Sequence, residues 1–476
     1  MERTLKPSIY FLLVIFSCST LAKGLSPYLP LNTAYEAEAL IDQLLAITPG
    51  APLTKPYKAV EVYRRLEQIE TSHPSLYGQL SRYMSRYTRT YGRTHIDLEL
   101  ALSDDGEQPL ANNRGAMISD SYALSSGAFY QPSPYFLASA GINYSEAAGF
   151  RHTNSYLGFG YEYAQFEFGY REHWFSPFKY SSMLVSTHAE PSPSITVSNA
   201  TPITDWNIRY ELFYSKLESV EGIRLGDKLF PGSPRHGGLH LSFTPFEFWT
   251  LGLNRTLQFG GGERDVDLGD VFEALFNPAG KDNLGRDEKE NDPNYEFGNQ
   301  QASITTQLNL NWGMPFQVYG EFGGEDTLDE SNYKLGNQTF SVGLYLPMVA
   351  ENLSLRYEHN HWSTAWYVHH LYPDGYTNAG RLMGHWGAEQ KVENTAPPAS
   401  VDTLGINYQW PGLGVLHARI ALIRNEQRDA FDYQRGYQVE LQYSHATSYG
   451  FFGAGLLYSK TTLGDTQSRL NIYYRW

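Results

Sequence analysis

Residues 469–476, RLNIYYRW, have a pattern that indicates the fold of the chain. Read as a strand, this stretch places apolar and aromatic side chains on one face and polar or charged ones on the other, because successive residues point to opposite sides. The apolar face holds Leu470, Ile472, Tyr474 and Trp476. Such a two-faced strand is typical of an outer-membrane barrel, with lipid outside and a wet lumen inside. A strand of a soluble β-sandwich has the same alternation, so other segments are needed to distinguish a barrel from a sandwich.

The same alternation recurs along the chain with charges on the inner face. It is present in WNIRYELFY (206–214), SITTQLNLNW (303–312), LHARIAL (416–422) and YQVELQY (437–443). Their polar faces carry Arg209, Glu211, Arg419 and Glu440. Such charges are expensive in a dry sandwich core and ordinary in a wet lumen. The pattern therefore favours a membrane barrel.

The connections between the strands indicate how the barrel is threaded. From residue 93 onward, about eighteen strand candidates are joined by alternately short and long links, as in barrels with short periplasmic turns and long outer loops. An even count leaves both ends of the barrel on the periplasmic side. We therefore predict an all-β transmembrane barrel over residues 93–476. The short links lie at 131, 163, 244, 313, 349, 411 and 445, and the long ones near 176–192, 219–235, 259–299, 324–336, 361–398 and 425–433.

The first residues have the pattern of a secretory signal peptide. Arg3 and Lys6 precede the apolar run IYFLLVIF, and TLA supplies a small-residue cleavage site. We predict that residues 1–22 are removed after Ala22. Cys18, the one cysteine of the chain, falls in this segment. The mature chain then has no cysteine, which excludes a disulfide scaffold or a thiolate site.

Residues 23–92 are predicted to form a small periplasmic helical bundle. TAYE (33–36) has the form of a capping box before an apolar stripe of helical spacing. A second helix is expected to begin around Thr54 and Pro56, and a third to run from residue 74 and stop at Gly92. So small a bundle is not expected to stand alone, so it should pack on the barrel or plug it.

Composition limits the classes of function. Acidic side chains outnumber Lys and Arg by 51 to 36, which argues against nucleic acid as a partner. Aromatic residues make up 15% of the chain, yet no mature segment is a continuous apolar run long enough for a membrane helix. No G-x-S-x-G motif links a serine to a hydrolase site. We therefore expect no enzyme activity.

Several long segments resemble the Wzi family of capsule assembly proteins. They are REHWFSPFKYSSMLVSTHAEPSPSITVSN (171–199), RTLQFGGGERDVDLGDVFEALF (255–276), YGEFGGED (319–326), HHLYPDGYTNAGRLMGHW (369–386) and the lead-in SPYLPLNTAYEAEALIDQL. The resemblance implies an outer-membrane lectin that binds capsular polysaccharide or exopolysaccharide and anchors it to the cell surface. It also implies a barrel with a periplasmic helical bundle. Expected partners are the polysaccharide, the lipids of the outer membrane and the polysaccharide export machinery.

One outer segment, residues 361–386, has the residue types that sugars require. Flat aromatic faces stack on sugar C–H surfaces, and arginine binds the carboxylates of acidic polymers. In the alternative interpretation, some of these rings form the upper lipid belt and others fold the loop inward. The candidate glycan-binding residues are Trp362, Trp366, Tyr367, His369, Tyr372, Tyr376, Arg381, His385 and Trp386.

Two patterns raise the question of metal binding. Asp265, Asp267 and Asp270 are candidate Ca²⁺ ligands, although their spacing is not that of an EF-hand and solvated charge is the alternative. His359 and His361 share one face of a strand, with His369 and His370 close behind. No third ligand is identifiable for these histidines, so we interpret them as polar side chains of the lumen.

A porin-like channel for oligosaccharides or other small solutes is the rival function. The charged side chains of the inner face suit a water-filled pore as well as a lumen that is plugged by protein. The alternation alone does not decide whether the lumen is open.

Overall fold

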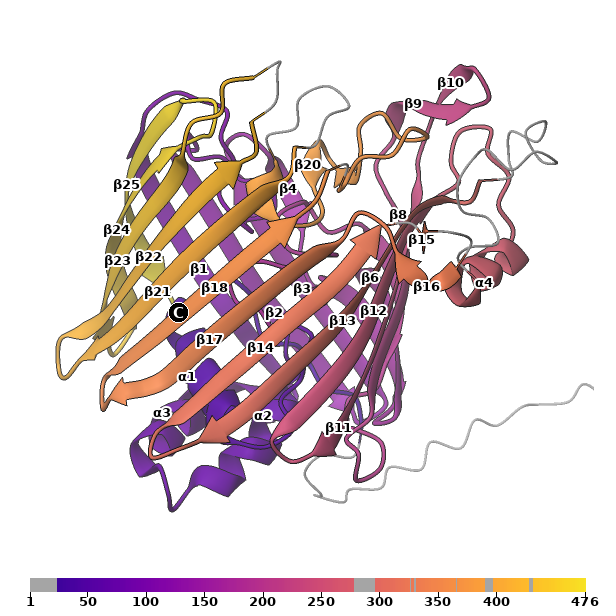
Figure 1. Cartoon of the computed structure of the whole chain (residues 1–476). Coiled ribbons are helices and arrows are strands. Elements are labelled where there is room, and N and C mark those ends of the chain that lie inside the picture. Colours follow the sequence, from indigo (N-terminus) through magenta and orange to yellow (C-terminus); the bar gives the residue numbers. More distant parts are fainter. Residues whose placement is uncertain are drawn as a thin grey trace, which may run out of the picture.

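The computed structural model describes residues 24–277, 296–325, 327–328, 331–364, 366–389, 397–427 and 431–476. Antiparallel strands wind around a lumen, helices lie at one end, and long loops lie at the other (Figure 1). We call these the helical end and the loop end. The predicted signal peptide lies outside the described residues.

The barrel is one sheet of 19 strand segments closed by pairing of β1 with β25. β4 and β5 both pair with β3 and share one position, so the wall has 18 positions. The predicted fold class is thereby confirmed. The wall consists of β1 (Tyr91–Ser103), β2 (Tyr122–Ser133), β3 (Phe136–Ser145), β4 (Gly149–His152), β5 (Ser155–Tyr161), β6 (Ala164–Tyr170), β7 (Pro193–Ser198), β8 (Arg209–Lys216), β11 (Arg235–Phe246), β12 (Trp249–Phe259), β13 (Gly298–Asn311), β14 (Pro315–Glu325), β17 (Thr339–Ala350), β18 (Leu353–Trp362), β21 (Ala399–Trp410), β22 (Gly414–Asn425), β23 (Gly436–Thr447), β24 (Gly450–Lys460) and β25 (Thr466–Arg475).

The two faces of the wall have the predicted polarity. On β25, Leu470 and Ile472 are 54% and 59% exposed on the outside, whereas Arg469 and Arg475 are buried inside. β8 likewise exposes Leu212 and Tyr214 and buries Arg209 and Glu211. Apolar outer positions and charged inner positions are what a lipid-facing barrel requires.

The links between strands also follow the predicted alternation. All the short links predicted from the sequence are tight turns at the helical end. One further link at that end, residues 199–208 between β7 and β8, was not predicted. A long link at the loop end, residues 104–121 between β1 and β2, was also not predicted. The guanidinium of Arg86 stacks on Trp476 at 4.4 Å from the ring centre, which places the C-terminal residue at the helical end.

Several smaller helices and strands lie at the loop end. A two-stranded ribbon rises between β8 and β11, and a short helix lies beside the top of the wall (Figure 1). These elements are β9 (Val220–Leu225), β10 (Lys228–Gly232), α4 (Leu268–Phe276), β15 (Thr327–Leu328), β16 (Ser331–Leu335), β19 (Thr377–Asn378), β20 (Arg381–Leu382) and the 3₁₀ turn η4 (Trp386–Ala388).

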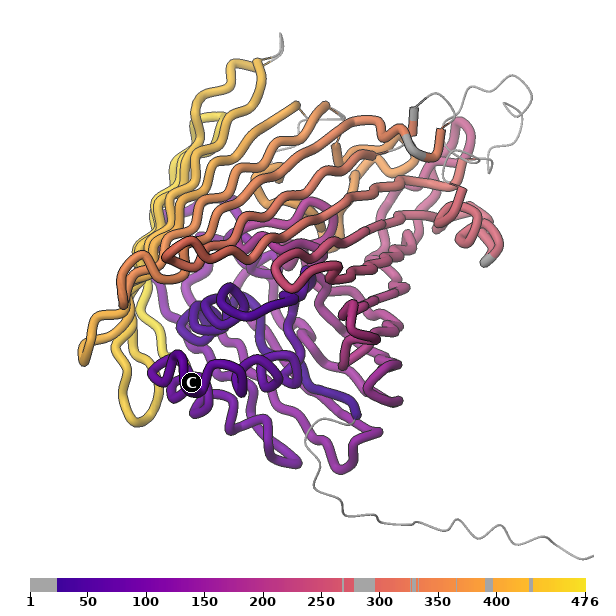
Figure 2. The backbone as a smooth tube through the Cα atoms, turned by 60° about the horizontal axis from the view of Figure 1, so that its bottom comes forward, coloured from indigo at the N-terminus to yellow at the C-terminus, as the bar shows by residue number. Residues whose placement is uncertain are grey.

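Three helices and two short 3₁₀ turns lie across the opening at the helical end (Figure 2). No helix in the described part of the chain is long and apolar enough to cross a membrane. We call residues 24–90 the plug. Its helices are α1 (Tyr35–Ile47), α2 (Ala59–Leu66), η1 (Glu67–Ile69), α3 (Pro74–Met84) and η2 (Ser85–Thr88).

The structure corrects three predicted helix ends. The prediction of a capping box that begins at Thr33 is wrong. Ala34 is the N-cap of α1, and the carboxylate of Glu38 accepts a hydrogen bond from the N–H of Thr33 at 3.1 Å. The second helix begins at Ala59, because Lys58 forms a β-bridge with Tyr28 that keeps the preceding residues extended. Gly92 is not a helix stop and lies inside β1.

The plug is bound to the inside of the wall by apolar packing and by ion pairs. Its apolar core continues into Phe129, Leu137 and Tyr156 of the wall. Three buried ion pairs join its helices to wall arginines. They are Glu36–Arg475 at 3.4 Å, Asp42–Arg356 at 3.0 Å and Glu61–Arg209 at 2.6 Å.

Candidate functional site

Two of the segments that fold into the lumen from the loop end carry the candidate residues or pack directly against them. We call residues 171–192, between β6 and β7, the inward loop, and the described residues between 363 and 389 the cap. Met183 and Leu184 of the inward loop and Trp366 and Tyr367 of the cap are all 0% exposed and belong to one apolar cluster. The inward loop reaches the plug, where Lys179 pairs with Glu38. Plug, inward loop and cap therefore form a continuous filling.

Hydrogen bonds fix the cap in this position. The Tyr367 hydroxyl donates to the carbonyl oxygen of Met183 at 2.6 Å and accepts the N–H of His385 at 2.9 Å. The Trp386 indole N–H donates to the carbonyl oxygen of Tyr180 at 2.9 Å. Burial raises the pKa of Tyr367 far above its usual range, so its hydroxyl stays a neutral donor. These three hydrogen bonds between the cap and the inward loop, or within the cap, are made by neutral groups.

The predicted glycan-binding aromatics lie in the interior. The exposed fractions are 1% for Trp362, 0% for Trp366 and 4% for Trp386, and Tyr372, Tyr376 and His385 are equally buried. The aromatic rings therefore fold the loop inward, as one of the two interpretations of the sequence proposed. Their protein neighbours cover them in this conformation. Whether any of them contacts glycan stays a prediction.

Arg381 is the member of the predicted set that reaches the surface most. Its side chain is 27% exposed, and its Nη1 lies 3.1 Å from the Glu389 carboxylate. That carboxylate also faces His188 at 3.2 Å and accepts the N–H of Leu382 at 3.0 Å. Burial alone raises the pKa of Glu389, but these partners outweigh it and lower the pKa. Glu389 is therefore an anion that positions Arg381 at the rim of the cap.

The three aspartates predicted as calcium candidates lie at the start of α4. Asp267 accepts the N–H of Asp270, and Asp270 accepts the N–H of Asp267, both at 2.9 Å. This reciprocal pair is a capping box, which satisfies otherwise unpaired N–H groups of the first turn. Two of the three carboxylates thus have a structural task. Calcium binding there stays a prediction.

The histidines of β18 lie on the opposite side of the wall from the one predicted. His359 and His361 do share one face of the strand, but that face points outward beside Phe340 and not into the lumen. His359 lies 2.9 Å from the Asp402 carboxylate on the outer surface. The lumenal interpretation of these two residues is therefore wrong. The cause is register: the inner positions of β18 are taken by Arg356, Glu358 and Asn360.

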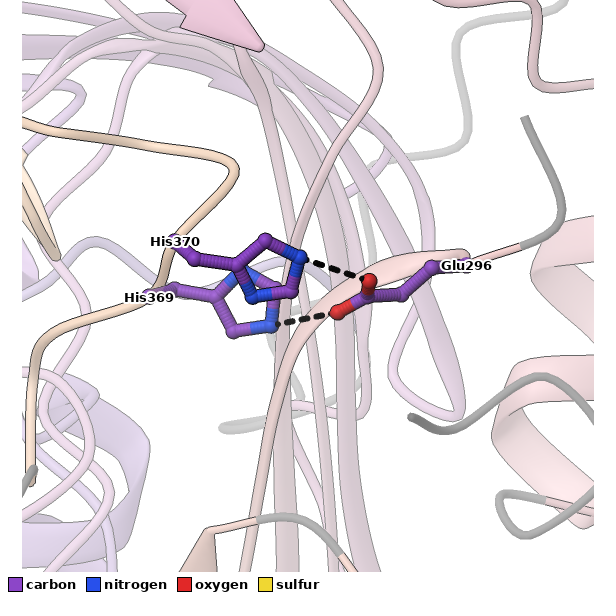
Figure 3. Close-up of side chains that lie close together, drawn as sticks. All are labelled: Glu296, His369 and His370. Carbon is purple, nitrogen blue, oxygen red and sulfur yellow. Dashed lines mark ion pairs between the residues drawn. The ribbon is translucent and has the colours of Figure 1, made fainter. Parts of the chain in front are cut away.

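The other two histidines meet a carboxylate that the sequence analysis missed. His369 and His370 extend from the cap toward Glu296, which precedes β13 (Figure 3). The Nε2 atoms of His369 and His370 lie 3.1 and 2.9 Å from the two oxygens of Glu296. Burial raises the pKa of Glu296, but the two histidines outweigh it and lower the pKa to about 2. Nothing in the sequence spacing connects Glu296 with these histidines.

A polar cavity of about 90 Å³ remains inside the barrel beside the plug. Its lining includes the ion pairs Arg469–Glu99 at 2.7 Å and Arg419–Glu440 at 2.9 Å. The prediction that Arg419 and Glu440 face the lumen is thereby confirmed. The cavity is polar and large enough for several water molecules.

The sequence and the fold were compared with known proteins. A 55.8 kDa protein in the cps region of Klebsiella pneumoniae is 24% identical over 308 residues, which cover 61% of this chain and 56% of that protein. The match thus spans little more than half the length of this relative. The solved structure of Wzi, an outer membrane protein involved in group 1 capsule assembly in Escherichia coli and a carbohydrate-binding β-barrel, is similar over 94% of this chain and 99% of its own. The TM-score is 0.70 at 14% identity, so this likeness shows the fold.

The family comparison covers the larger part of the barrel. The family model for the capsule assembly protein Wzi matches residues 102–394. The matched range contains the inward loop, the cap and the Glu296 cluster. The chain therefore belongs to the Wzi family of capsule assembly proteins.

Proposed function

We propose that this protein lies in the bacterial outer membrane, binds capsular or extracellular polysaccharide, and anchors it to the cell surface during capsule assembly. Membership of the Wzi family is the observation that carries this proposal. The apolar outer face of the wall supports a membrane location. In this orientation the helical end faces the periplasm and the export machinery, and the loop end faces outward.

Binding is proposed to be noncovalent, without a catalytic step. A repeating polymer offers many copies of the same group, so weak single contacts add up to stable tethering. The proposed contact surface is the loop end around the rim of the cap. Arg381 is a partly exposed cation of the cap, and the buried aromatic residues support the cap from below.

The filled lumen favours tethering over a channel function. The plug, the inward loop and the cap occupy the path that a solute would take. In a planar bilayer we expect no stable ohmic steps from the intact protein, with a variant lacking residues 25–91 as the comparison. Stable steps from the intact protein would show that the lumen conducts and would favour the porin-like alternative.

The direct test is binding of the producing organism's own surface polysaccharide. The protein is folded in detergent, and the same preparation denatured by heat is the control. Saturable binding with micromolar or tighter sites is expected. Absence of binding contradicts the proposal if heat-modifiable migration on gels shows that the barrel is folded.

A single substitution tests the proposed contact surface. Arg381→Ala is expected to weaken binding of an acidic polysaccharide at least about tenfold, because a charge-assisted hydrogen bond contributes roughly 1.5–3 kcal/mol. Arg435→Ala is the matched control, since Arg435 is an exposed arginine at the loop end outside the cap. Equal affinities of the two variants would remove the rim of the cap from the binding surface.

A further inference from the structure

Three side chains with metal-binding atoms converge at the loop end from two separate segments. Glu296 stands just before β13, and His369 and His370 belong to the cap (Figure 3). Their ligand atoms all lie within 4.8 Å of one another. Within the described residues, this is the one group of three or more such side chains so close together. The side chains of Glu296 and His369 are 5% and 6% exposed, and that of His370 is 48% exposed.

The main chain on both sides of the cluster is held by two arginines. Arg264 donates to the carbonyl oxygen of Glu296 and, at 3.1 Å, to that of Arg224. Arg224 in turn donates from its side chain to the carbonyl oxygen of His370 at 3.1 Å. Its own main-chain N–H donates to the carbonyl oxygen of Leu371 at 2.9 Å. The three ligands are therefore carried on backbone that is already fixed, which is what a binding site for an ion needs.

The two nitrogen–oxygen distances are close to those around a tetrahedral ion, and all three ligand atoms lie within 4.8 Å of one another. Ligands about 2.0–2.1 Å from Zn²⁺ are separated by roughly 3.3–3.4 Å. The two nitrogen–oxygen distances, 3.1 and 2.9 Å, are a few tenths of an ångström shorter, so an ion needs only small outward shifts of these side chains. The half-exposed His370 leaves the fourth position to water.

One contact opposes metal binding. The N–H of Leu371 lies 3.3 Å from Nδ1 of His369, which therefore acts as an acceptor. A ring that binds metal through Nε2 carries its proton on Nδ1 and loses this contact. At 3.3 Å the hydrogen bond is long, and its loss is small beside the coordination of an ion.

We propose that Glu296, His369 and His370 bind one divalent transition-metal ion and that this ion joins the cap to the wall at β13. Zn²⁺ is the best fit, because two imidazoles and one carboxylate with a water in the fourth position form a common zinc ligand set. Imidazole donors disfavour Ca²⁺ and Mg²⁺, which take oxygen ligands. The site is separate from the aspartates of α4.

The test uses the whole mature chain folded in detergent, without a histidine tag and after treatment with a chelator. Titration with Zn²⁺ in a calorimeter is expected to give one equivalent with a micromolar or tighter Kd. Titration with Co²⁺ is expected to give the visible absorption of a four-coordinate site. His370→Ala and Glu296→Gln are each expected to weaken Zn²⁺ binding at least tenfold, whereas Ca²⁺ is not expected to compete.

A matched control separates this site from ordinary surface histidines. His359→Ala removes a histidine that also faces a carboxylate, Asp402, but has no second histidine in a three-ligand group. This variant is expected to bind Zn²⁺ like the parent. Heat-modifiable migration on gels verifies that every variant is folded, and the half-exposed position of His370 makes its replacement safe for folding.

Either of two results overturns the proposal. One is a parent protein without saturable Zn²⁺ binding. The other is unchanged Zn²⁺ affinity in the double variant of Glu296 and His370, which would place the ion elsewhere. No glycan is present in these measurements, so their outcome is independent of the polysaccharide test.

Discussion

The two ends of the lumen are closed by different kinds of contact. At the helical end, charged side chains of the plug meet charged side chains of the wall, as in Asp42–Arg356 and Glu61–Arg209. At the loop end, the cap rests on an apolar and aromatic cluster. Its links at the centre, such as Tyr367 to Met183, are neutral, and its charged contacts, such as Glu389 with His188, lie toward the rim. The plug thus adds buried charge pairs with the wall to its apolar packing, whereas the centre of the cap is held by a packed apolar core.

The difference predicts which closure can open. A buried ion pair separated by movement leaves two unpaired charges in a poorly solvated place, which is strongly unfavourable. An apolar cluster that separates exposes surface to water, and the loss grows with the area exposed. Part of the cap can therefore open without stranding a charge, whereas the plug is held as a unit with the wall. The outward end, where polysaccharide is proposed to bind, is then the adaptable one.

The largest expected effect is at the helical end. Glu61→Ala leaves the buried guanidinium groups of Arg65 and Arg209 without their shared carboxylate. Breaking a buried pair from one side costs about 3–5 kcal/mol of unfolding free energy. Urea unfolding of the detergent-folded protein, followed by its migration on gels, measures the loss.

A pair on the outer surface is the control for Glu61. Arg424 faces Asp402 at 3.3 Å and is 56% exposed. Arg424→Ala is expected to change the unfolding free energy by no more than about 0.5 kcal/mol. Similar losses in both variants would mean that burial does not distinguish the pairs and that the plug is not held by its charges.

Acid is expected to weaken the same contact. Burial raises the pKa of Glu61, but Arg209 and Arg65 outweigh it and lower the pKa to about 2 from a usual value of 4.5. A carboxyl group with a lowered folded-state pKa stabilises the fold above the unfolded-state value, and this stability is lost as the pH falls from 4.5 to 2. The expected slope for this one group is at most about 1.4 kcal/mol per pH unit.

Glu61→Gln tests the assignment of that slope. Glutamine takes up no proton, so the contribution of this position to the pH dependence between pH 4.5 and 2 disappears in unfolding curves measured at several pH values. An unchanged slope in the variant would show that the acid sensitivity does not come from Glu61.

The contact at the loop end has a smaller and more local expected effect. Tyr367→Phe removes the hydroxyl that donates to Met183 and accepts from His385, and it leaves both backbone groups without a partner. A buried unpaired polar group costs about 1–3 kcal/mol. Hydrogen exchange is expected to accelerate in the cap and to remain unchanged in the plug.

A tyrosine outside the cap provides the control for this measurement. Tyr449 is 76% exposed in a turn at the helical end, so Tyr449→Phe should leave exchange in the cap unchanged. Faster exchange throughout the Tyr367→Phe variant would show that the cap and the plug open together. The contrast between the two closures would then fail.

The sequence predicts the wall better than it predicts the filling. Alternation has a period of two along every strand, so inner positions such as Arg209 and Arg475 could be assigned without knowledge of the partner strand. Which face of a strand points into the lumen depends on its register with the neighbouring strands. For this reason His359 and His361 were assigned to the wrong face. Helix starts depended on contacts distant in sequence, such as the bridge between Tyr28 and Lys58.

The candidate site was predicted in part for a related reason. The residue types in the cap identified an aromatic cluster, but composition does not show whether rings face solvent or one another. Trp366 and Tyr367 are buried because the inward loop supplies Met183 and Leu184 beneath them. Glu296 could not be linked to His369 and His370, because their proximity is created by the cap, which folds from the end of β18 toward the segment before β13.

The smallest expected effect distinguishes a helix cap from a calcium site at α4. Asp267→Ala removes the acceptor of the Asp270 N–H and is expected to destabilise α4 by about 1 kcal/mol, seen as faster amide exchange in that helix. Asp267→Asn keeps an acceptor at the N-cap, where asparagine is as favourable as aspartate, so exchange in α4 should stay near that of the parent. If the cluster of Asp265, Asp267 and Asp270 binds Ca²⁺, loss of one charge in Asp267→Asn should weaken that binding. A Ca²⁺-dependent slowing of exchange in the parent that Asp267→Asn abolishes would therefore assign the cluster to calcium, whereas equal exchange with and without Ca²⁺ would leave Asp267 as a cap.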